Sequence, residues 1–494
     1  MKACIARLLA LVLTLVVLAG QPLVVGAAEL PQQERRAGPL VVRYVGADGA
    51  AGRAEFAWYA SAAEQAYHEV QDIFAVALRQ TQTPPRSEIV VTVYGTDQAY
   101  AEVNPLAARS DGVLAHAQPQ AGTVGVAAAR LRDKAEGFRR DSIRHELTHV
   151  VLGDLSSQRL PIGFQEGIAQ YLERDIDQRQ GFANTVRQAR AAGQLLSLSD
   201  LNRQRVFLGA ASLAYPESYS MVVFLSQQYG FGQVIQLVIA TREAPTLDAA
   251  VREVFGRSLD DLDADWQAFL PGYLDEGWAR DDLDLWNLEQ PQKLLADGKY
   301  AEAREQLDRA DALFDSVGRA DRVQQALDGR QRAVSGIEAT DLGQRGMAAL
   351  MAGQYQTAAE LLEQAAPSWN AAGDGRRADL VAVAAEQARD GQSAVTQLDE
   401  ARQQLDGWHF QAADDLAFEA GQTLAELGDD ARTEEARQVM RDAEQLRIRL
   451  GMAAAGGAVL SVGALGVAWA AGRRRRRPAT DPPGVAVMEK DWSL

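Results

Sequence analysis

Cysteine is nearly absent from this sequence: of its 494 residues, only Cys4 is a cysteine. The folded part of the chain therefore has no internal disulfide, which excludes a small disulfide-rich secreted scaffold but not a protein of the cell envelope. Aromatic residues are also scarce, at 7%, and alanine is abundant, so helical packing is favoured over a β-sandwich. The chain is 47% hydrophobic and 24% charged, which is typical of folded protein, and its length suggests about two to four domains.

The chain also lacks an excess of basic charge. Its formal net charge is -17, and residues 29–472 alone hold 42 basic and 64 acidic side chains. Such an acidic body repels phosphate backbones and anionic lipid surfaces. We therefore expect no nucleic-acid partner.

The N-terminus has the pattern of a secretory signal peptide. Lys2 and Arg7 form a basic start, an apolar run covers residues 8–19, and small residues occupy positions 26–28. A basic start, a short apolar core and small residues at the exit are the parts of such a signal, so residues 1–28 are predicted to be removed. An uncleaved signal anchor is the alternative.

A second long apolar run lies near the C-terminus. Residues 450–472 contain no charged side chain, and five arginines follow directly at 473–477. About twenty apolar helical residues cross a hydrocarbon core, and arginine clusters stay on the cytoplasmic side. We therefore expect a single-pass protein of the cell membrane, with residues 29–449 outside the cytoplasm and a basic tail, 473–494, inside.

Residues 40–130 alternate between strand-like and helical patterns. A helix is expected over 56–79, because its apolar residues recur at three- and four-residue spacing, and the stretch QPQAG indicates a hairpin loop. After residue 130 the pattern is helical to about residue 270, which predicts an α+β domain with one small sheet followed by helices. The expected strands, by their β-branched content and bounding Gly and Pro, are 41–44, 89–95, 112–117 and 122–128.

A helical region with an internal repeat follows, from about residue 283 to 449. Three similar phrases place glycine at 298, 353 and 407, with alanine five residues later at 303, 358 and 412. In each phrase we expect the glycine to form a turn between helices, beside an aromatic residue. This region resembles tetratricopeptide helical hairpins, although that repeat is about 34 residues long and this one about 55. A partner-binding solenoid and a plain helical stalk both remain open.

The segment His145-Glu146-Leu147-Thr148-His149 carries the clearest chemistry in the sequence. On a helix, residues four apart share a face, so the two imidazoles point at one spot and Glu146 lies beside them. Two imidazoles, an open coordination position and an adjacent carboxylate are what zinc-assisted hydrolysis requires. Gly153 is expected to end this helix in the left-handed conformation.

Glu166 is the expected third ligand. It follows His149 by 17 residues on a second helix, which Pro161 and Gly163 are expected to begin, and the chain between them is long enough to turn back antiparallel. The two histidines and this glutamate then form a His₂Glu zinc site.

This combination resembles the gluzincin metallopeptidases, specifically the bacterial peptidase MA-like group. That family commonly reads W-F-x-E-G-h-A-x-Y around the third ligand, and residues 163–171 here read GFQEGIAQY, with Gly163 in place of tryptophan. A metzincin is excluded, because Leu152 and Leu155 stand where its glycine and third histidine should be. The resemblance covers about residues 40–280 and implies zinc, a peptide or protein substrate, and a peptidase domain over residues 29–280, before a helical repeat region over 281–449.

The resemblance also implies a tyrosine that stabilises the oxyanion. Tyr215 is the expected residue, with Tyr219 in reserve, and a packed helical aromatic is the alternative for each. Gln170 and Asp154 are weighed as residues that orient the ligands, but a solvated or capping role is favoured for each. No role at the site is expected for the remaining histidines, which are His68, His116 and His409.

These residues predict a mechanism. Zinc held by the three ligands activates water, Glu146 removes its proton, and the GTVGVAA strand (122–128) aligns the substrate as an edge strand. Two other functions stay open: an idle protease-like scaffold that binds partners through its helical repeats, and a zinc hydrolase that acts on other carbonyl compounds.

Overall fold

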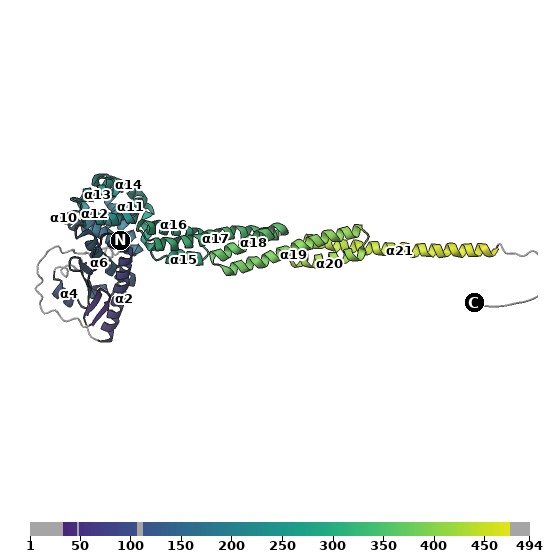
Figure 1. Cartoon of the computed structure of the whole chain (residues 1–494), viewed down its shortest axis with the longest axis horizontal. Coiled ribbons are helices and arrows are strands. Elements are labelled where there is room, and N and C mark those ends of the chain that lie inside the picture. Colours follow the sequence, from purple (N-terminus) through teal and green to yellow (C-terminus); the bar gives the residue numbers. More distant parts are fainter. Residues whose placement is uncertain (1–32, 47–48, 106–111, 475–494) are drawn as a thin grey trace, which may run out of the picture. The chain divides into compact units, whose positions relative to one another are not determined.

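The computed structural model describes residues 33–46, 49–105 and 112–474. Side chains are described as far as residue 455. The predicted signal peptide and cytoplasmic tail lie outside the described residues. The chain divides into two compact units, one up to Val334 and one from Ser335 onward (Figure 1). This division falls inside the long helix α17 (Ala320–Met351). The domain boundary expected near residue 280 stays a prediction.

A five-stranded sheet forms one side of the first unit. Its order is β1-β2-β3-β5-β4, with β2, β3 and β5 parallel and the two outer strands antiparallel to their neighbours. The four predicted strands are confirmed, and the fifth, β1, was missed because its sequence QERRA is polar and held by ion pairs such as Arg35–Glu64. The strands are β1 (Gln33–Ala37), β2 (Leu40–Val45), β3 (Ile89–Tyr94), β4 (Ala115–Gln118) and β5 (Thr123–Ala127).

The edge strand differs from the prediction. The strand of the GTVGVAA segment, β5, is internal, since it pairs with β3 on one side and β4 on the other. The strand at that edge is β4, which the hairpin loop returns antiparallel to β5.

Two helices cover one face of the sheet. The helices α2 and α6 bury an apolar core against the strands, in which Val91, Val124, Ile143 and Leu147 are all almost fully inaccessible. The helix predicted over 56–79 is present, but it is interrupted at Phe74, which leaves the helical conformation. The helices up to the metal-binding pair are α2 (Ala50–Ile73), α3 (Ala75–Gln80), α4 (Asp97–Val103), α5 (Ala128–Leu131), α6 (Glu136–Ser156) and α7 (Ile162–Tyr171).

The rest of the first unit is helical, as predicted. The core helix α11 packs against α7 and α8. The remaining elements are α8 (Ile176–Ala192), α9 (Leu198–Leu201), α10 (Gln204–Gly209), α11 (Ala211–Tyr229), α12 (Phe231–Ala240), α13 (Leu247–Phe255), α14 (Leu259–Asp275), η2 (Gly277–Ala279), η3 (Asp282–Leu285), α15 (Glu289–Ala296), α16 (Tyr300–Ser316) and the first part of α17 (Ala320–Met351).

The second unit consists of long helices with short ones between them (Figure 1). They are the rest of α17, α18 (Tyr355–Ala372), α19 (Gly375–Asp406), α20 (Phe410–Glu426) and α21 (Asp430–Arg474). Consecutive helices pack side by side along their length, through alanine-rich faces. Several of these helices are far longer than those of a tetratricopeptide hairpin, and the tetratricopeptide-like repeat expected from the glycine spacing stays a prediction.

The backbone corrects one position of the repeat. Gly298 and Gly353 adopt the left-handed conformation as expected, with φ of 75° and 67°, but in the third phrase Trp408, not Gly407, has that conformation, with φ of 67°. The period is thus 55 residues at both steps. The buried alanine of the third phrase is accordingly Ala413 rather than Ala412.

The apolar run at 450–472 belongs to α21, whose backbone is helical as far as Arg474. Within the part of the chain that the structure describes, no single helix is both long and apolar enough to cross a membrane; the bent pair α11 and α12 passes by length and composition together. The membrane span predicted at 450–472 stays a prediction.

Candidate metal centre

The helix α6 carries both histidines of the HExxH segment and is almost fully buried over that stretch. It continues three residues beyond Gly153 and ends with Ser157 in the left-handed conformation, so Gly153 does not end it as predicted. Gly153 is required for space instead, because a Cβ there would lie 2.8 Å from the Cβ of Pro119 in the β4–β5 turn. The glycine thus lets the hairpin approach the helix that carries the site.

The helix α7 begins where the sequence predicts. Pro161 is the residue before its first turn, and its missing N–H costs no hydrogen bond there. A Cβ at Gly163 would meet the carbonyl oxygen of Leu201 at 2.8 Å, so the tryptophan common at this position in the resembled family has no room. A Cβ at Gly167 would meet the carbonyl oxygen of Ser218 on α11 at 2.4 Å. Two glycines therefore let α7 lie close to its supports.

The two helices bring the three predicted ligands together. The Nε2 atoms of His145 and His149 are 3.1 Å apart, and Oε2 of Glu166 lies 3.4 Å from the first and 3.5 Å from the second. All three side chains are at most 1% exposed. No other described group of three such side chains converges in this way.

These distances suit a zinc ion. With bonds of about 2.0–2.1 Å and tetrahedral angles, two zinc ligands lie about 3.3–3.4 Å from each other. Both carboxylate oxygens of Glu166 are buried without a hydrogen-bond partner, as are both oxygens of Glu146. Buried carboxylates without donors are costly, and a divalent cation bound by Glu166 would offset that cost for this ligand. The donor set of two imidazoles and one carboxylate is that of catalytic zinc sites.

Burial and mutual charge shift the pKa values of these groups. Burial raises the pKa of Glu146 to about 8 and lowers the pKa of His149. Burial by itself would lower the pKa of His145, but the carboxylates of Glu166 and Glu173 reverse this, so that pKa lies well above its usual range. Burial alone would raise the pKa of Glu166, but the two histidines outweigh it, so that pKa is lowered. The site thus favours a charged Glu166, a neutral His149 and a more basic His145.

Sequence reasoning missed Glu173, which completes the site. Its Oε1 accepts a hydrogen bond from Nδ1 of His145 at 2.5 Å, and the residue is 5% exposed. With its proton on Nδ1, His145 presents the lone pair of Nε2 to the other two ligands. Glu173 lies seven residues after Glu166 but beyond the end of α7, so helical spacing alone does not place it beside the ligands.

A buried ionic network fixes the position of Glu173. Arg144 of α6 donates to the carbonyl of Leu172 at 3.0 Å, and the N–H of Arg174 donates to Asp141 at 3.0 Å. Arg179 donates to the carbonyl of Glu173 itself at 3.1 Å. Three successive residues after α7 are therefore tied down on both sides of the carboxylate. The remaining members are ion pairs of Arg144 and Arg174 with Glu69 of α2, and of Arg144 with Asp141.

The edge strand β4 borders the site. It packs against α6, and the N–H of Ala117 lies near enough to the Glu146 carboxylate to favour its charged form without making a direct hydrogen bond. Behind the strand, His116 accepts or donates a 2.9 Å hydrogen bond with the hydroxyl of Tyr100, and burial lowers its pKa to about 4. His116 is therefore a neutral, structural histidine, as expected.

The other residues named from the sequence lie in different surroundings. Asp154 forms a two-oxygen ion pair with Arg86, so it has neither of the two roles weighed for it. The oxygen of Gln170 is buried without a partner, and Glu173 takes the orienting role. The ring of Tyr219 packs against the rings of Tyr171 and Phe182, and its hydroxyl lies near the charges of Arg179 and Asp281. Tyr215 is fully buried with its ring 4.9 Å from that of Phe207, and its role in catalysis stays a prediction.

The two remaining histidines are not among the three converging ligands. His68 is exposed on α2, and His409 is exposed in the turn before α20.

Comparison with known proteins adds one match. Residues 70–272 match the family described as the Peptidase MA superfamily, which supports a zincin-like peptidase domain. This range contains α6, α7 and α11, the helices that build the site. The searches of curated proteins and of solved structures returned no match.

Proposed function

We propose that this protein is a zinc-dependent peptidase. The observation that carries the proposal is the convergence of three buried ligand atoms, from His145, His149 and Glu166, within 3.1–3.5 Å of one another. The family match over residues 70–272 agrees with it. A full set of ligands, general base and orienting carboxylate favours an enzyme over an idle scaffold.

Each side chain has a distinct part in the proposed reaction. A zinc ion at this position supplies Lewis acidity toward water and the scissile carbonyl. Glu146, a buried carboxylate on the helix turn between the two histidines, accepts a proton from the attacking water and delivers it to the leaving amine. Glu173 keeps His145 in the tautomer that ligates. A tyrosine hydroxyl, for which we propose Tyr215, donates to the oxyanion.

The substrate is proposed to be an extended peptide. Among the described strands, β4 pairs only with β5, and it lies beside Glu146, so we propose that its other side takes up the substrate by strand addition. In this proposal β4 takes the aligning role first assigned to the internal strand β5.

The charge-neutral variant Glu146→Gln tests the proposal. The purified full chain should bind one zinc per molecule and cleave an unstructured protein such as casein. The Glu146→Gln variant should keep its zinc and lose at least about 10²-fold of the cleavage rate. Equal cleavage by both would end the mechanism, and a wild type that holds zinc but cleaves no peptide would favour the scaffold.

We further propose that the protein is anchored in the cell membrane by residues 450–472. The support comes from the uncharged run and the five arginines that follow it. A chain ending after Arg449 should leave the membrane fraction. If both forms sediment with membranes after alkaline extraction, the anchor lies elsewhere.

A further inference from the structure

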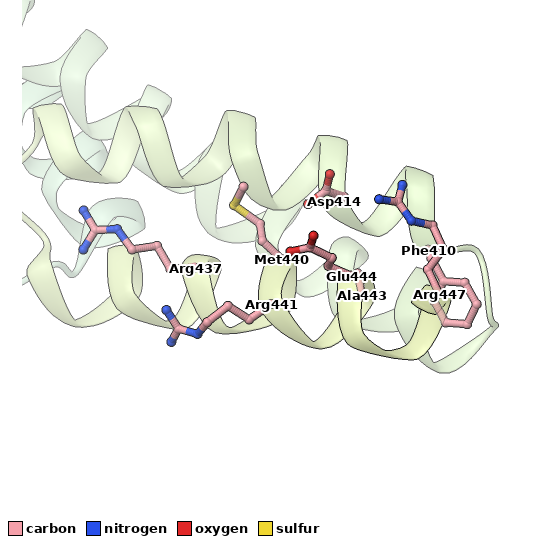
Figure 2. A pocket seen from close by; sticks show the side chains of 8 residues that line it. All are labelled: Phe410, Asp414, Arg437, Met440, Arg441, Ala443, Glu444 and Arg447. Carbon is pink, nitrogen blue, oxygen red and sulfur yellow. The ribbon is translucent and has the colours of Figure 1, made fainter. Parts of the chain in front are cut away.

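A buried arginine of α8 lies between the metal centre and the turn η3, which follows the range matched by the family. The side chain of this residue, Arg179, is 4% exposed. Arg437 and Arg441 of the second unit differ from it, because they pair with Glu434 at the surface and are at least 47% exposed. Figure 2 shows these two arginines on α21, where they line a pocket of about 460 Å³. Surface pairs of that kind contribute little, but a buried arginine needs its charge met inside the protein.

Two carboxylates of η3 and its cap meet the charge of Arg179. Its Nη1 and Nη2 donate to the two oxygens of Asp284 at 2.7 and 2.9 Å, and Nη2 lies 3.2 Å from Oδ2 of Asp281. The Asp281 side chain is fully buried, and its other oxygen accepts from the N–H of Leu283 at 2.9 Å, which caps η3. The two-pronged pair with Asp284 fixes the plane of the guanidinium as well as its position.

The same guanidinium reaches the metal centre. Nη2 of Arg179 donates to the carbonyl of Glu173 at 3.1 Å, and the carboxylate of Glu173 bonds to Nδ1 of His145. Glu173 lies beyond the end of α7, outside regular secondary structure, so the place of its carboxylate depends in part on contacts from other elements. A continuous series of contacts thus runs from Asp284 through Arg179 and Glu173 to a metal ligand.

The turn η3 is itself held by residues farther along the chain. Arg309 of α16 donates to Asp282 at 2.9 and 2.6 Å. The indole of Trp286, directly after η3, donates to Asp72 of α2 at 3.0 Å. The place of Asp284 is therefore set by a part of the first unit that lies outside the matched range, 70–272.

From these contacts we propose that Asp284 is a positioning residue of the metal centre, acting through Arg179 on Glu173. The inference rests on the proposed zinc peptidase and extends it, because the working enzyme then includes the turn η3 beyond residue 280. Without Asp284 the guanidinium keeps only Asp281 and loses its fixed plane, so it no longer holds the carbonyl of Glu173 in place. A less well placed Glu173 orients His145 less strongly toward the metal.

The variant Asp284→Ala tests the role in the purified full chain. The Asp284 side chain is 41% exposed, so its removal leaves no enclosed cavity. Zinc affinity, measured by competition with a chromogenic chelator and without substrate, should fall about three- to tenfold. Asp282→Ala is the matched control, since Asp282 lies in the same turn but pairs with Arg309, and it should bind zinc like the wild type.

A double variant separates positioning from a general loss of stability. If Asp284 acts through Glu173, then adding Asp284→Ala to Glu173→Ala should change zinc affinity little, because the side chain that it positions is absent. The positioning role would be overturned by an equal fold-loss in both backgrounds, by unchanged affinity in Asp284→Ala, or by the same loss in Asp282→Ala.

The same measurement distinguishes this inference from the proposed function. A wild type that binds no zinc would overturn the proposed function and the positioning role together. A wild type that binds zinc but cleaves no peptide would overturn the peptidase alone, and a loss of zinc affinity confined to Asp284→Ala in the presence of Glu173 would still support the positioning role.

Discussion

Nδ1 of His145 lies 2.5 Å from Oε1 of Glu173, a carboxylate that is no ligand itself. The contact is buried, and the backbone on both sides of Glu173 is tied to α6 by Arg144 and Asp141. The geometry of the predicted zinc site therefore depends on a residue that the HExxH pattern does not reveal.

The variant Glu173→Gln should bind zinc about 10–100-fold more weakly, because the amide holds His145 less strongly in its ligating tautomer. Competition with a chromogenic chelator measures this affinity without any substrate. Glu243, whose side chain is 90% exposed, provides a matched change: Glu243→Gln should bind zinc like the wild type. Unaltered affinity in Glu173→Gln would leave Glu173 with a purely structural role.

The variant Gly167→Ala should disturb the site through its packing. A Cβ there would lie 2.4 Å from a backbone carbonyl of α11, so α7 must shift together with the adjacent Glu166. We expect a loss of about 1–3 kcal/mol in the free energy of unfolding and weaker zinc binding. Gly137, near the start of α6, has open space around it, and Gly137→Ala should change neither. Denaturant unfolding and chelator competition measure the two effects.

The predicted role of Tyr215 can be separated from that of Tyr219. If Tyr215 donates to the oxyanion, Tyr215→Phe should lower kcat about 10²-fold and leave KM and zinc content nearly unchanged. Tyr219→Phe should keep kcat, because the Tyr219 hydroxyl lies near Arg179 and Asp281 and not near the metal ligands. Steady-state kinetics on one peptide substrate decide this, and the reverse pattern would exchange the two roles.

Replacing the buried Glu217 by glutamine should raise the free energy of unfolding by an amount that depends on pH. Burial, aided by the charge of Asp263, raises its pKa from about 4.5 to about 8 in the folded state. Between these values the folded chain keeps a proton that the unfolded chain has released, so stability falls as pH rises. Glu217→Gln should therefore be more stable than the wild type, by an amount that grows from pH 4.5 to 8 to at most a few kcal/mol.

Thermal unfolding of both proteins across that pH range measures the difference. The exposed Glu253 serves for comparison, since Glu253→Gln should follow the wild-type curve. A Glu217→Gln gain that does not change with pH would rule out the elevated pKa as its cause.

Gly391 of α19 lies directly against the ring of Tyr355, so an alanine at this position should destabilise the second unit locally. Gly391→Ala places a Cβ 2.4 Å from the ring of Tyr355, and the ring is held by Asp429 and Arg432, so it cannot move away freely. We expect a cost of about 1–3 kcal/mol, seen as faster hydrogen exchange in α18 and α19. Gly375→Ala, at the open start of α19, should be neutral or slightly stabilising.

The metal ligands could be predicted from the sequence because their chemistry is local. His145 and His149 share a helix face by periodicity alone, and Glu166 follows after a connection short enough to force the two helices together. The apolar strands β2, β3 and β5 could be predicted for the same reason, whereas β1 could not, since ion pairs and not hydrophobic alternation stabilise it.

Other features depended on contacts between distant parts of the chain. The sequence by itself determined the two imidazoles and the carboxylates of Glu146 and Glu166, since each follows from spacing along a helix or a short connection. Only the tertiary structure decided that β4 and not β5 forms the edge, that Glu173 orients His145, and that Trp408 rather than Gly407 is the left-handed residue of its turn. These follow from which surfaces meet, and spacing along one element carries no information about a neighbour contributed from elsewhere in the fold.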